Sequence, residues 1–166
     1  MRIAPIPVLL FVGLFTLPAA AEPLLVTPAQ IGEAFCLSRL TGDTGPITGL
    51  LTPELTVAIA DAEAKNDTIQ KQAPDEKPPL GDGIPWQSWT DYADKCTVGA
   101  VTLMQNEAKV AIDYAFTEYP EANFTDTLEL RLIPGPYDNT LWRLDNIAYA
   151  TDSDLKTVLI SAFLPN

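Results

Sequence analysis

Hydrophobic and polar residues alternate along the second half of the chain, a pattern typical of strands that bury one face. The alternation is clearest in one segment, where four apolar side chains share a side: Val110, Ile112, Tyr114 and Phe116. Residues 97–105 form a run rich in apolar side chains, two further segments alternate over shorter stretches, and turn residues separate all four segments. We therefore expect four strands, over residues 97–105, 110–117, 127–132 and 142–149.

The last of these segments does not keep a strict alternation. Trp142 and Leu144 fall on one side, and Ile147 joins that side only if an extra residue interrupts the strand. Such an extra residue is a β-bulge. We predict a bulge near Asp145 and Asn146.

The first half of the chain and its last residues have helical spacing instead. At the first helix start, Thr27 can cap the helix, Pro28 suits its first position and Gln30 can complete a capping box. Thr52 and Pro53 repeat the first two of these signals. We expect helices over residues 27–40, 47–51, 52–66 and 152–162.

Residues 71–85 form a proline- and glycine-rich segment, KQAPDEKPPLGDGIP. Neither helix nor strand can persist through such a sequence, so we expect a long surface loop. Loops of this length in compact domains are often functional, which makes this one a candidate lid or partner contact.

The order of these elements predicts an α+β fold: N-terminal helices, a four-stranded antiparallel meander and a C-terminal helix. Residues 22–166 have the length of a single domain with one hydrophobic core.

Residues 1–21 have the order of a secretory signal peptide. Arg2 precedes an apolar run over residues 8–17, and Pro18 is followed by three alanines. The run is shorter than the roughly 20 residues of a membrane-spanning helix. We expect cleavage after Ala21, an uncleaved anchor being the alternative. The protein would then be periplasmic or secreted, with no membrane span.

Composition excludes several functions. The chain has 22 acidic and 10 basic side chains, and loss of Arg2 with the leader leaves a net charge of −13. Such a surface repels nucleic acid and anionic lipid. Histidine is absent, which excludes serine–histidine and cysteine–histidine catalytic pairs and any histidine-ligated metal or haem site. We expect no cofactor.

The two cysteines, Cys36 and Cys96, both belong to the exported part of the chain. An oxidising compartment favours their pairing, so we predict one disulfide. The alternatives are a free thiol pair or a two-cysteine metal site.

Several sequence segments together resemble a known fold. A helical first half with LLTPEL, then GDGIPWQSW, a meander and LWRLDNI are similar to the nuclear-transport-factor-2-like fold. Within that fold, the chain resembles the bacterial exported family called domain of unknown function 3828. The resemblance spans residues 27–163 and implies a curved, cone-like sheet whose concave side is filled by helices, sometimes around a pocket. It transfers no catalytic residue, because members of this fold range from enzymes to binding modules.

Aromatic residues supply the candidate ligand pocket or partner patch. Trp86, Trp89 and Tyr92 follow the loop at intervals of three residues and would form a stripe on a helical turn. The simpler interpretation is that these rings belong to the core. Tyr114 and Trp142 of the sheet complete the candidate set.

Asp113, Tyr114 and Asp145 are the candidates for acid–base chemistry. Adjacent strand residues face opposite sides, so Asp113 and Tyr114 cannot both line one cavity without distortion. We therefore assign no catalytic residue.

The leading hypothesis is an exported, non-catalytic domain that binds a small apolar molecule or another envelope protein. An isomerase or hydrolase using carboxylates and tyrosine, and an inhibitor or immunity protein, are the alternatives.

Overall fold

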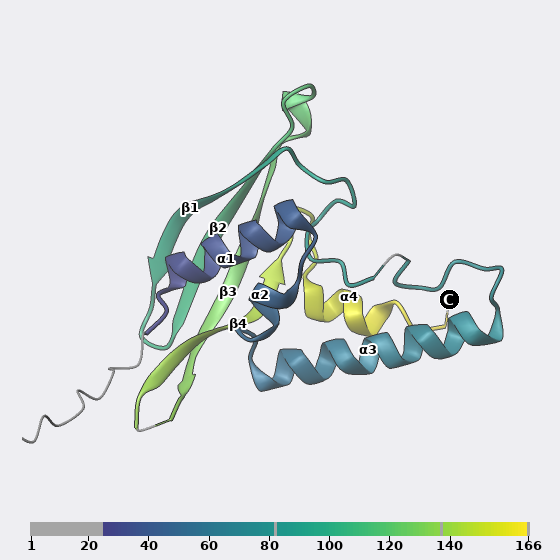
Figure 1. The fold of residues 1–166 in the computed structure, drawn as a ribbon, viewed down its shortest axis with the longest axis horizontal. Coiled ribbons are helices and arrows are strands. Elements are labelled where there is room, and N and C mark those ends of the chain that lie inside the picture. Colours follow the sequence, from purple (N-terminus) through teal and green to yellow (C-terminus); the bar gives the residue numbers. More distant parts are fainter. Residues whose placement is uncertain (1–24, 82, 137, 166) are drawn as a thin grey trace, which may run out of the picture.

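A computed structural model describes residues 25–81, 83–136 and 138–165. The predicted leader, residues 1–21, lies outside this part of the chain. The described residues fold as three helices, a four-stranded sheet and a last helix, as predicted (Figure 1). The elements are α1 (Pro28–Thr41), α2 (Gly45–Thr48), α3 (Pro53–Gln72), β1 (Lys95–Leu103), β2 (Glu107–Ala115), β3 (Phe124–Pro134), β4 (Thr140–Ala148) and α4 (Leu155–Ser161), with a 3-10 turn at Pro120–Ala122.

The four strands pair in sequence order, each antiparallel to the next, which confirms the predicted meander. α1 lies across one face of the sheet, whereas α3 and α4 pack together beside β4 (Figure 1). The edge of β4 is partly covered, because the backbone of residues 50–52 exchanges hydrogen bonds with Leu144, each 2.8 Å long.

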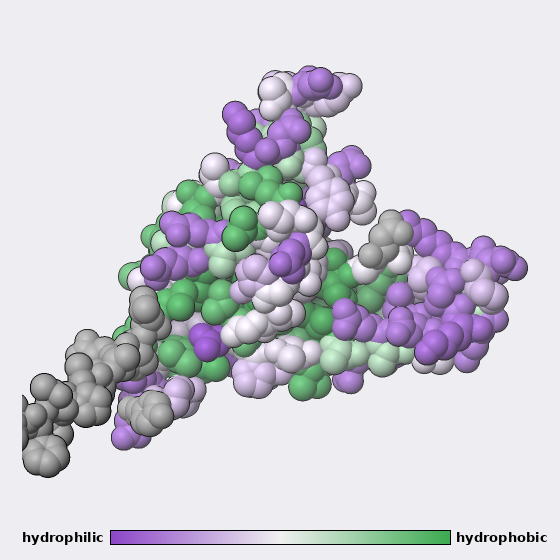
Figure 2. Space-filling model, in the orientation of Figure 1, coloured by the Kyte–Doolittle hydropathy of each residue, from purple (hydrophilic) through white to green (hydrophobic). Residues whose placement is uncertain are grey.

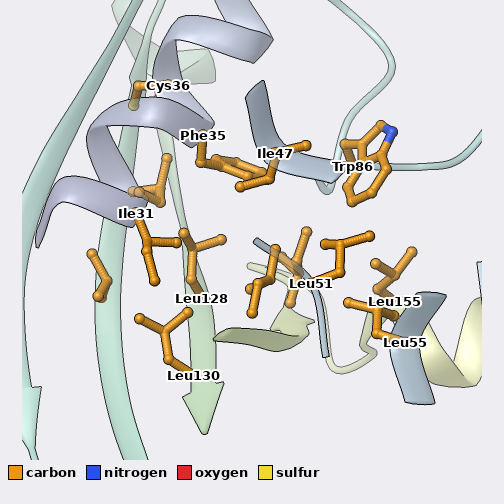
Figure 3. Close-up of a cluster of buried hydrophobic side chains, with 14 of the residues drawn as sticks. Ile31, Phe35, Cys36, Ile47, Leu51, Leu55, Trp86, Leu128, Leu130 and Leu155 are labelled. Carbon is orange, nitrogen blue, oxygen red and sulfur yellow. The ribbon is translucent and has the colours of Figure 1, made fainter. Parts of the chain in front are cut away.

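The hydrophobic core lies between the sheet and the helices (Figure 3). Its largest buried side chains come from the helical half and from alternate positions of the strands, as the sequence pattern requires. They include Ile31, Phe35, Ile47, Leu55, Ile112, Tyr114, Leu128, Leu130, Leu144, Ile147 and Leu155.

The predicted bulge in β4 is present. Glu129 pairs with Asn146 and the next residue, Leu130, pairs with Leu144, so Asp145 has no partner position on β3. As a result Leu144 and Ile147 both face the core. β1 also has an irregular register, between Val98 and Val101, which the sequence pattern did not predict.

The first helix begins as predicted. The Thr27 backbone N–H donates to Gln30 Oε1 (2.9 Å), and the Gln30 N–H donates to Thr27 Oγ1 (3.3 Å). This is the reciprocal capping box that the spacing of the two residues indicated.

α3 ends at Gln72, six residues later than the predicted end near Asn66. The polar sequence around Asn66 contains no glycine or proline, and a helix propagates through such residues until Pro74 removes a backbone donor. Hydrophilic residues gather at this far end of α3 and on the loop that follows it (Figure 2).

The predicted disulfide between Cys36 and Cys96 is present, with 5.2 Å between the two Cα atoms. It joins α1 to the start of β1, two segments separated by 60 residues in the sequence.

Candidate functional site

The candidate site lies at the end of the sheet where β2 stops and β3 begins. The connection between these strands carries Phe116 and Tyr119, and Phe124 is the first residue of β3. The Phe116 N–H donates to the side-chain oxygen of Asn123 (2.8 Å), which fixes the two ends of the connection together. Figure 1 shows this connection projecting beyond α1, so no helix covers it.

Phe124 is the centre of an aromatic cluster. Its ring stacks on Tyr114 with 4.5 Å between the centroids, and it meets the edge of Trp89 at 6.5 Å. Phe116 lies on another side, with its centroid 6.3 Å from that of Phe124. Offset stacking and edge contacts of this kind are the favourable arrangements of aromatic rings.

Trp89, Phe116 and Phe124 line an open groove of about 730 Å³, here called the aromatic groove. Much of its lining is exposed to solvent: the exposed fraction is 51% for Trp89, 61% for Tyr119 and 69% for Tyr92. The lining residues are Trp89, Asp91, Tyr92, Phe116, Tyr119, Glu121, Ala122, Asn123, Phe124 and Ala150.

Residues 86–92 form one wall of the groove, and Asp126 fixes this wall to the sheet. The fully buried Asp126 carboxylate accepts hydrogen bonds from the Ser88 N–H and the Ala150 N–H, each 2.9 Å long. The Ser88 hydroxyl donates to the same carboxylate. A buried carboxylate needs such donors in place of water, so this network holds the wall in one position.

Arg39 of α1 supports the other end of the same wall. Its Nε donates to Gln87 Oε1 (2.9 Å), and the Gln87 amide donates to the backbone oxygens of Trp89 (2.8 Å) and Asp91 (2.7 Å). The Arg39 guanidinium also lies over the ring of Tyr92, 5.7 Å from its centroid. This is the distance of a cation–π interaction.

The charged residues of the groove lining are Asp91 and Glu121. Among the described residues, neither carboxylate pairs with a cation or accepts a hydrogen bond from another side chain. Asp94 lies close by, and a hydrogen bond from the Thr117 N–H (2.6 Å) lowers the pKa of its carboxyl group.

The structure separates the five aromatic residues that the sequence singled out. Residues 86–92 are not helical, so they form no helical stripe. Trp86 is buried and points into the core beside Ile47 (Figure 3), as the simpler interpretation expected of it. Trp89 and Tyr92 line the aromatic groove, and Tyr114 lies beneath it against Phe124.

Trp142 is distant from these residues. It pairs with Leu132, which is eight residues along β3 from Phe124. At about 3.3 Å per residue this places Trp142 roughly 25 Å from the groove.

The acid–base candidates are also separated. Asp113 accepts a hydrogen bond from the Thr125 hydroxyl (2.6 Å) on the sheet face opposite Tyr114. Asp145 is at the β4 bulge beside Leu130, whereas Tyr114 pairs with Phe124 six residues away. The separation along the strand is about 20 Å.

Tyr114 has a further property that bears on chemistry. Its hydroxyl is buried and has no hydrogen-bond partner among the described residues. Burial, and secondarily the charge of Asp126, raise the pKa of this phenol above its ordinary value. A phenol is already neutral at physiological pH, and this shift makes ionisation of Tyr114 still less favourable.

Sequence reasoning missed Phe116, Tyr119 and Phe124 as a group. The signal was the presence of three aromatic residues in FTEYPEANF. A turn between two strands is ordinarily hydrophilic, so three aromatic residues there are unusual. The alternation of residues 110–117 predicted Phe116 on a strand face instead.

Comparisons with protein-family models, curated proteins and solved structures gave no match. In the described residues, no helix is both long and apolar enough to cross a membrane. The same residues contain no cluster of three or more His, Cys, Asp or Glu side chains suited to a metal ion.

Proposed function

We propose that this chain is an exported, non-catalytic binding domain that holds a small molecule with an apolar body in the aromatic groove. The observation that carries the proposal is the exposure of Trp89, Tyr92 and Tyr119 around one groove. Burying these rings under a ligand would release water from a large apolar surface.

The dimensions of the groove favour a small molecule over a second protein. Its volume of about 730 Å³ is within the range of about 300–1,000 Å³ that is usual for small-molecule sites. The wall is held by Asp126 and Gln87, so a ligand would meet a largely preformed surface. An envelope protein that inserts an apolar side chain is the alternative occupant.

The disulfide supports the exported location, because structural disulfides persist mainly in oxidising compartments. The signal-like residues 1–21 point to the same location. We also propose that the fold is of the nuclear-transport-factor-2-like type. A helix across one face of an antiparallel meander, with a hollow at one end, supports that assignment.

The enzymatic alternative has less support. Acid–base catalysis needs groups held within hydrogen-bond reach of one substrate, and Asp113, Tyr114 and Asp145 are on different faces or about 20 Å apart. The exposed Asp91 and Glu121 in the groove have no side-chain partner in the described residues that would orient them.

A thermal-shift screen with aromatic and lipid compounds tests the proposal. We expect a subset of compounds to raise the melting temperature of the wild-type protein, with the shift lost in Trp89→Ala. Leu103→Ala is the control, because Leu103 is similarly exposed but lies at the far end of β1.

If no compound is active in the screen but the wild-type protein captures a stable partner from envelope extract and Trp89→Ala does not, the protein-binding alternative is favoured. An inactive screen together with an empty capture experiment would contradict both. Hydrolase or isomerase activity of the wild-type protein would favour the enzymatic alternative.

A further inference from the structure

The aromatic groove combines two kinds of surface that attract the same type of ligand. Its lining contains the two carboxylates of Asp91 and Glu121 and no lysine or arginine. Among the described residues, no lysine or arginine forms an ion pair with either carboxylate. The whole chain has a net charge of −12, so the surrounding field reinforces that of the groove.

The second surface is the faces of the aromatic rings. A ring face carries negative electrostatic potential and attracts cations. The protein already uses this property at the groove, where the Arg39 guanidinium lies 5.7 Å from the centroid of Tyr92. Trp89 and Tyr119 are exposed in the same groove, and no cation is placed over either ring by a described residue.

A neutral ligand would bury the rings but leave both carboxylates without a partner. An anion would be repelled by the two carboxylates and by the exposed ring faces, and the Arg39 guanidinium is already engaged over the ring of Tyr92. A hydrated metal ion would gain little from the rings, because such ions prefer several oxygen ligands. A cation with an apolar body satisfies both surfaces at once.

We propose that the ligand of the aromatic groove is an organic cation, a substituted ammonium group attached to an apolar or aromatic body. This inference rests on the proposed binding function. The body packs against Phe124 and Trp89, and the ammonium group lies towards Asp91 and Glu121.

Three benzyl compounds that differ in charge provide the test: benzyltrimethylammonium, benzyl alcohol and phenylacetate. Binding to the wild-type protein is measured by isothermal titration calorimetry. We expect the cation to bind about tenfold more tightly than benzyl alcohol, which corresponds to one favourable cation–π or charge contact. The preference should shrink in 0.5 M salt, because exposed charges are screened.

The double variant Asp91→Asn/Glu121→Gln should lose most of the preference for the cation and keep its affinity for benzyl alcohol. Asp75→Asn/Glu76→Gln removes the same charge from the exposed loop outside the groove, and it should bind like the wild-type protein. Because all four side chains are exposed, neither variant is expected to unfold.

The possible outcomes separate this inference from the proposed function. If benzyl alcohol or phenylacetate binds as tightly as the cation, the groove binds ligands but the cation inference is wrong. An equal loss of cation binding in both double variants would mean that net charge acts and the groove carboxylates do not. If none of the three compounds binds, the cation inference is overturned, and the thermal-shift screen decides separately on the proposed function.

Discussion

Asp126 has no exposed surface, although it lies on β3 only two residues from Phe124 of the aromatic groove. Its carboxylate accepts hydrogen bonds from the Ser88 N–H, the Ser88 hydroxyl and the Ala150 N–H. These bonds join the wall of the groove, β3 and the residues after β4. A single side chain therefore links the stability of the domain to the shape of the groove.

Asp126→Asn should lower the free energy of unfolding by about 1–3 kcal/mol. The amide group that replaces one carboxylate oxygen cannot accept from these donors, so a buried donor is left without a partner. Urea denaturation measures the loss.

Asp113→Asn is the matched control for this variant. Asp113 is also on the sheet, but its described hydrogen bond is a single one on the more exposed face, so the cost should stay below about 1 kcal/mol. Equal losses in the two variants would mean that the network around Asp126 has no special role.

Asp145 occupies the β4 bulge and forms ion pairs with two positively charged side chains. Its carboxylate lies 2.7 Å from Lys156 Nζ and 2.8 Å from Arg131 Nη2, and it accepts a hydrogen bond from the Thr52 hydroxyl (2.9 Å). Burial acts to raise the pKa of Asp145, but the Lys156 and Thr52 hydrogen bonds and the two positive charges outweigh it and lower the pKa.

A carboxylate with a lowered pKa stabilises the fold above its unfolded-state pKa of about 3.9, and the stabilisation is lost as pH falls through the folded-state pKa. Asp145→Asn should therefore cost about 1 kcal/mol at pH 7. The difference from wild type should shrink below about pH 4. Urea midpoints across this range measure it, and Asp152→Asn, at an exposed position, is the control. A difference that is independent of pH would contradict the ionic explanation.

At the scale of elements, the disulfide and the segment before α3 decide how the helices meet the sheet. Cys36 in α1 and Cys96 in β1 fasten the helix that covers the sheet to its first strand. At the opposite edge of the sheet, residues 50–52 pair with β4. The Thr52 hydroxyl caps α3 by accepting a hydrogen bond from the Leu55 N–H (3.2 Å). The helices are thus attached at both edges of the sheet.

Replacing both cysteines, in Cys36→Ala/Cys96→Ala, should lower the free energy of unfolding by about 4 kcal/mol, because the unfolded chain regains the entropy of a loop of 60 residues. Denaturation in urea measures the difference. Reductant should destabilise the wild-type protein similarly and leave the double variant unchanged. A wild-type midpoint that does not respond to full reduction would contradict this prediction.

At the scale of the whole molecule, one layer of helices covers the sheet only in part. α1 packs on the sheet and α4 lies beside β4, but neither reaches the connection between β2 and β3 (Figure 1). The aromatic groove is found there because core-facing positions continue along β2 and β3 past the end of the helical cover.

The export hypothesis also belongs to the whole molecule. When the full chain is expressed in a bacterium, the mature protein should begin at residue 22 and have 145 residues. Intact-mass spectrometry of the envelope fraction measures this, and alkylation without reductant should add no mass. Retention of residues 1–21 would contradict cleavage, and a doubly alkylated product would mean that the disulfide does not form in the cell.

Local patterns were sufficient for the elements. Alternation identified three of the strands, and an apolar run ended by turn residues identified the first. The interruption of the alternation predicted a bulge near Asp145 and Asn146, and the structure has it at Asp145. The cap at Thr27 was correct because its hydrogen bonds are made within four residues. The predicted end of α3 was wrong, because polar residues such as those around Asn66 do not show whether a helix continues through them. Pro74, by contrast, is a clear signal that a helix must end.

The site was predicted only in part. Trp89 and Tyr92 were candidates because of their three-residue spacing after the proline-rich loop, although the helical turn that this spacing implied is not formed. Asp126 was missed because the third strand was predicted to begin at residue 127. Extending the alternation of Leu128 and Leu130 back by one more pair places Asp126 and Phe124 on the core face, which is where the structure has them.

The sequence by itself determined the α+β order, the antiparallel meander and the pairing of its two cysteines, because these depend on periodicity, on turn residues and on there being one way to pair two thiols. Only the tertiary structure decided which rings meet. Trp86 and Trp89 are three residues apart, yet one is in the core and the other in the groove, because Asp126 and Ala150 bind Ser88 between them. Such contacts join residues tens of positions apart and depend on where the sheet places them in space.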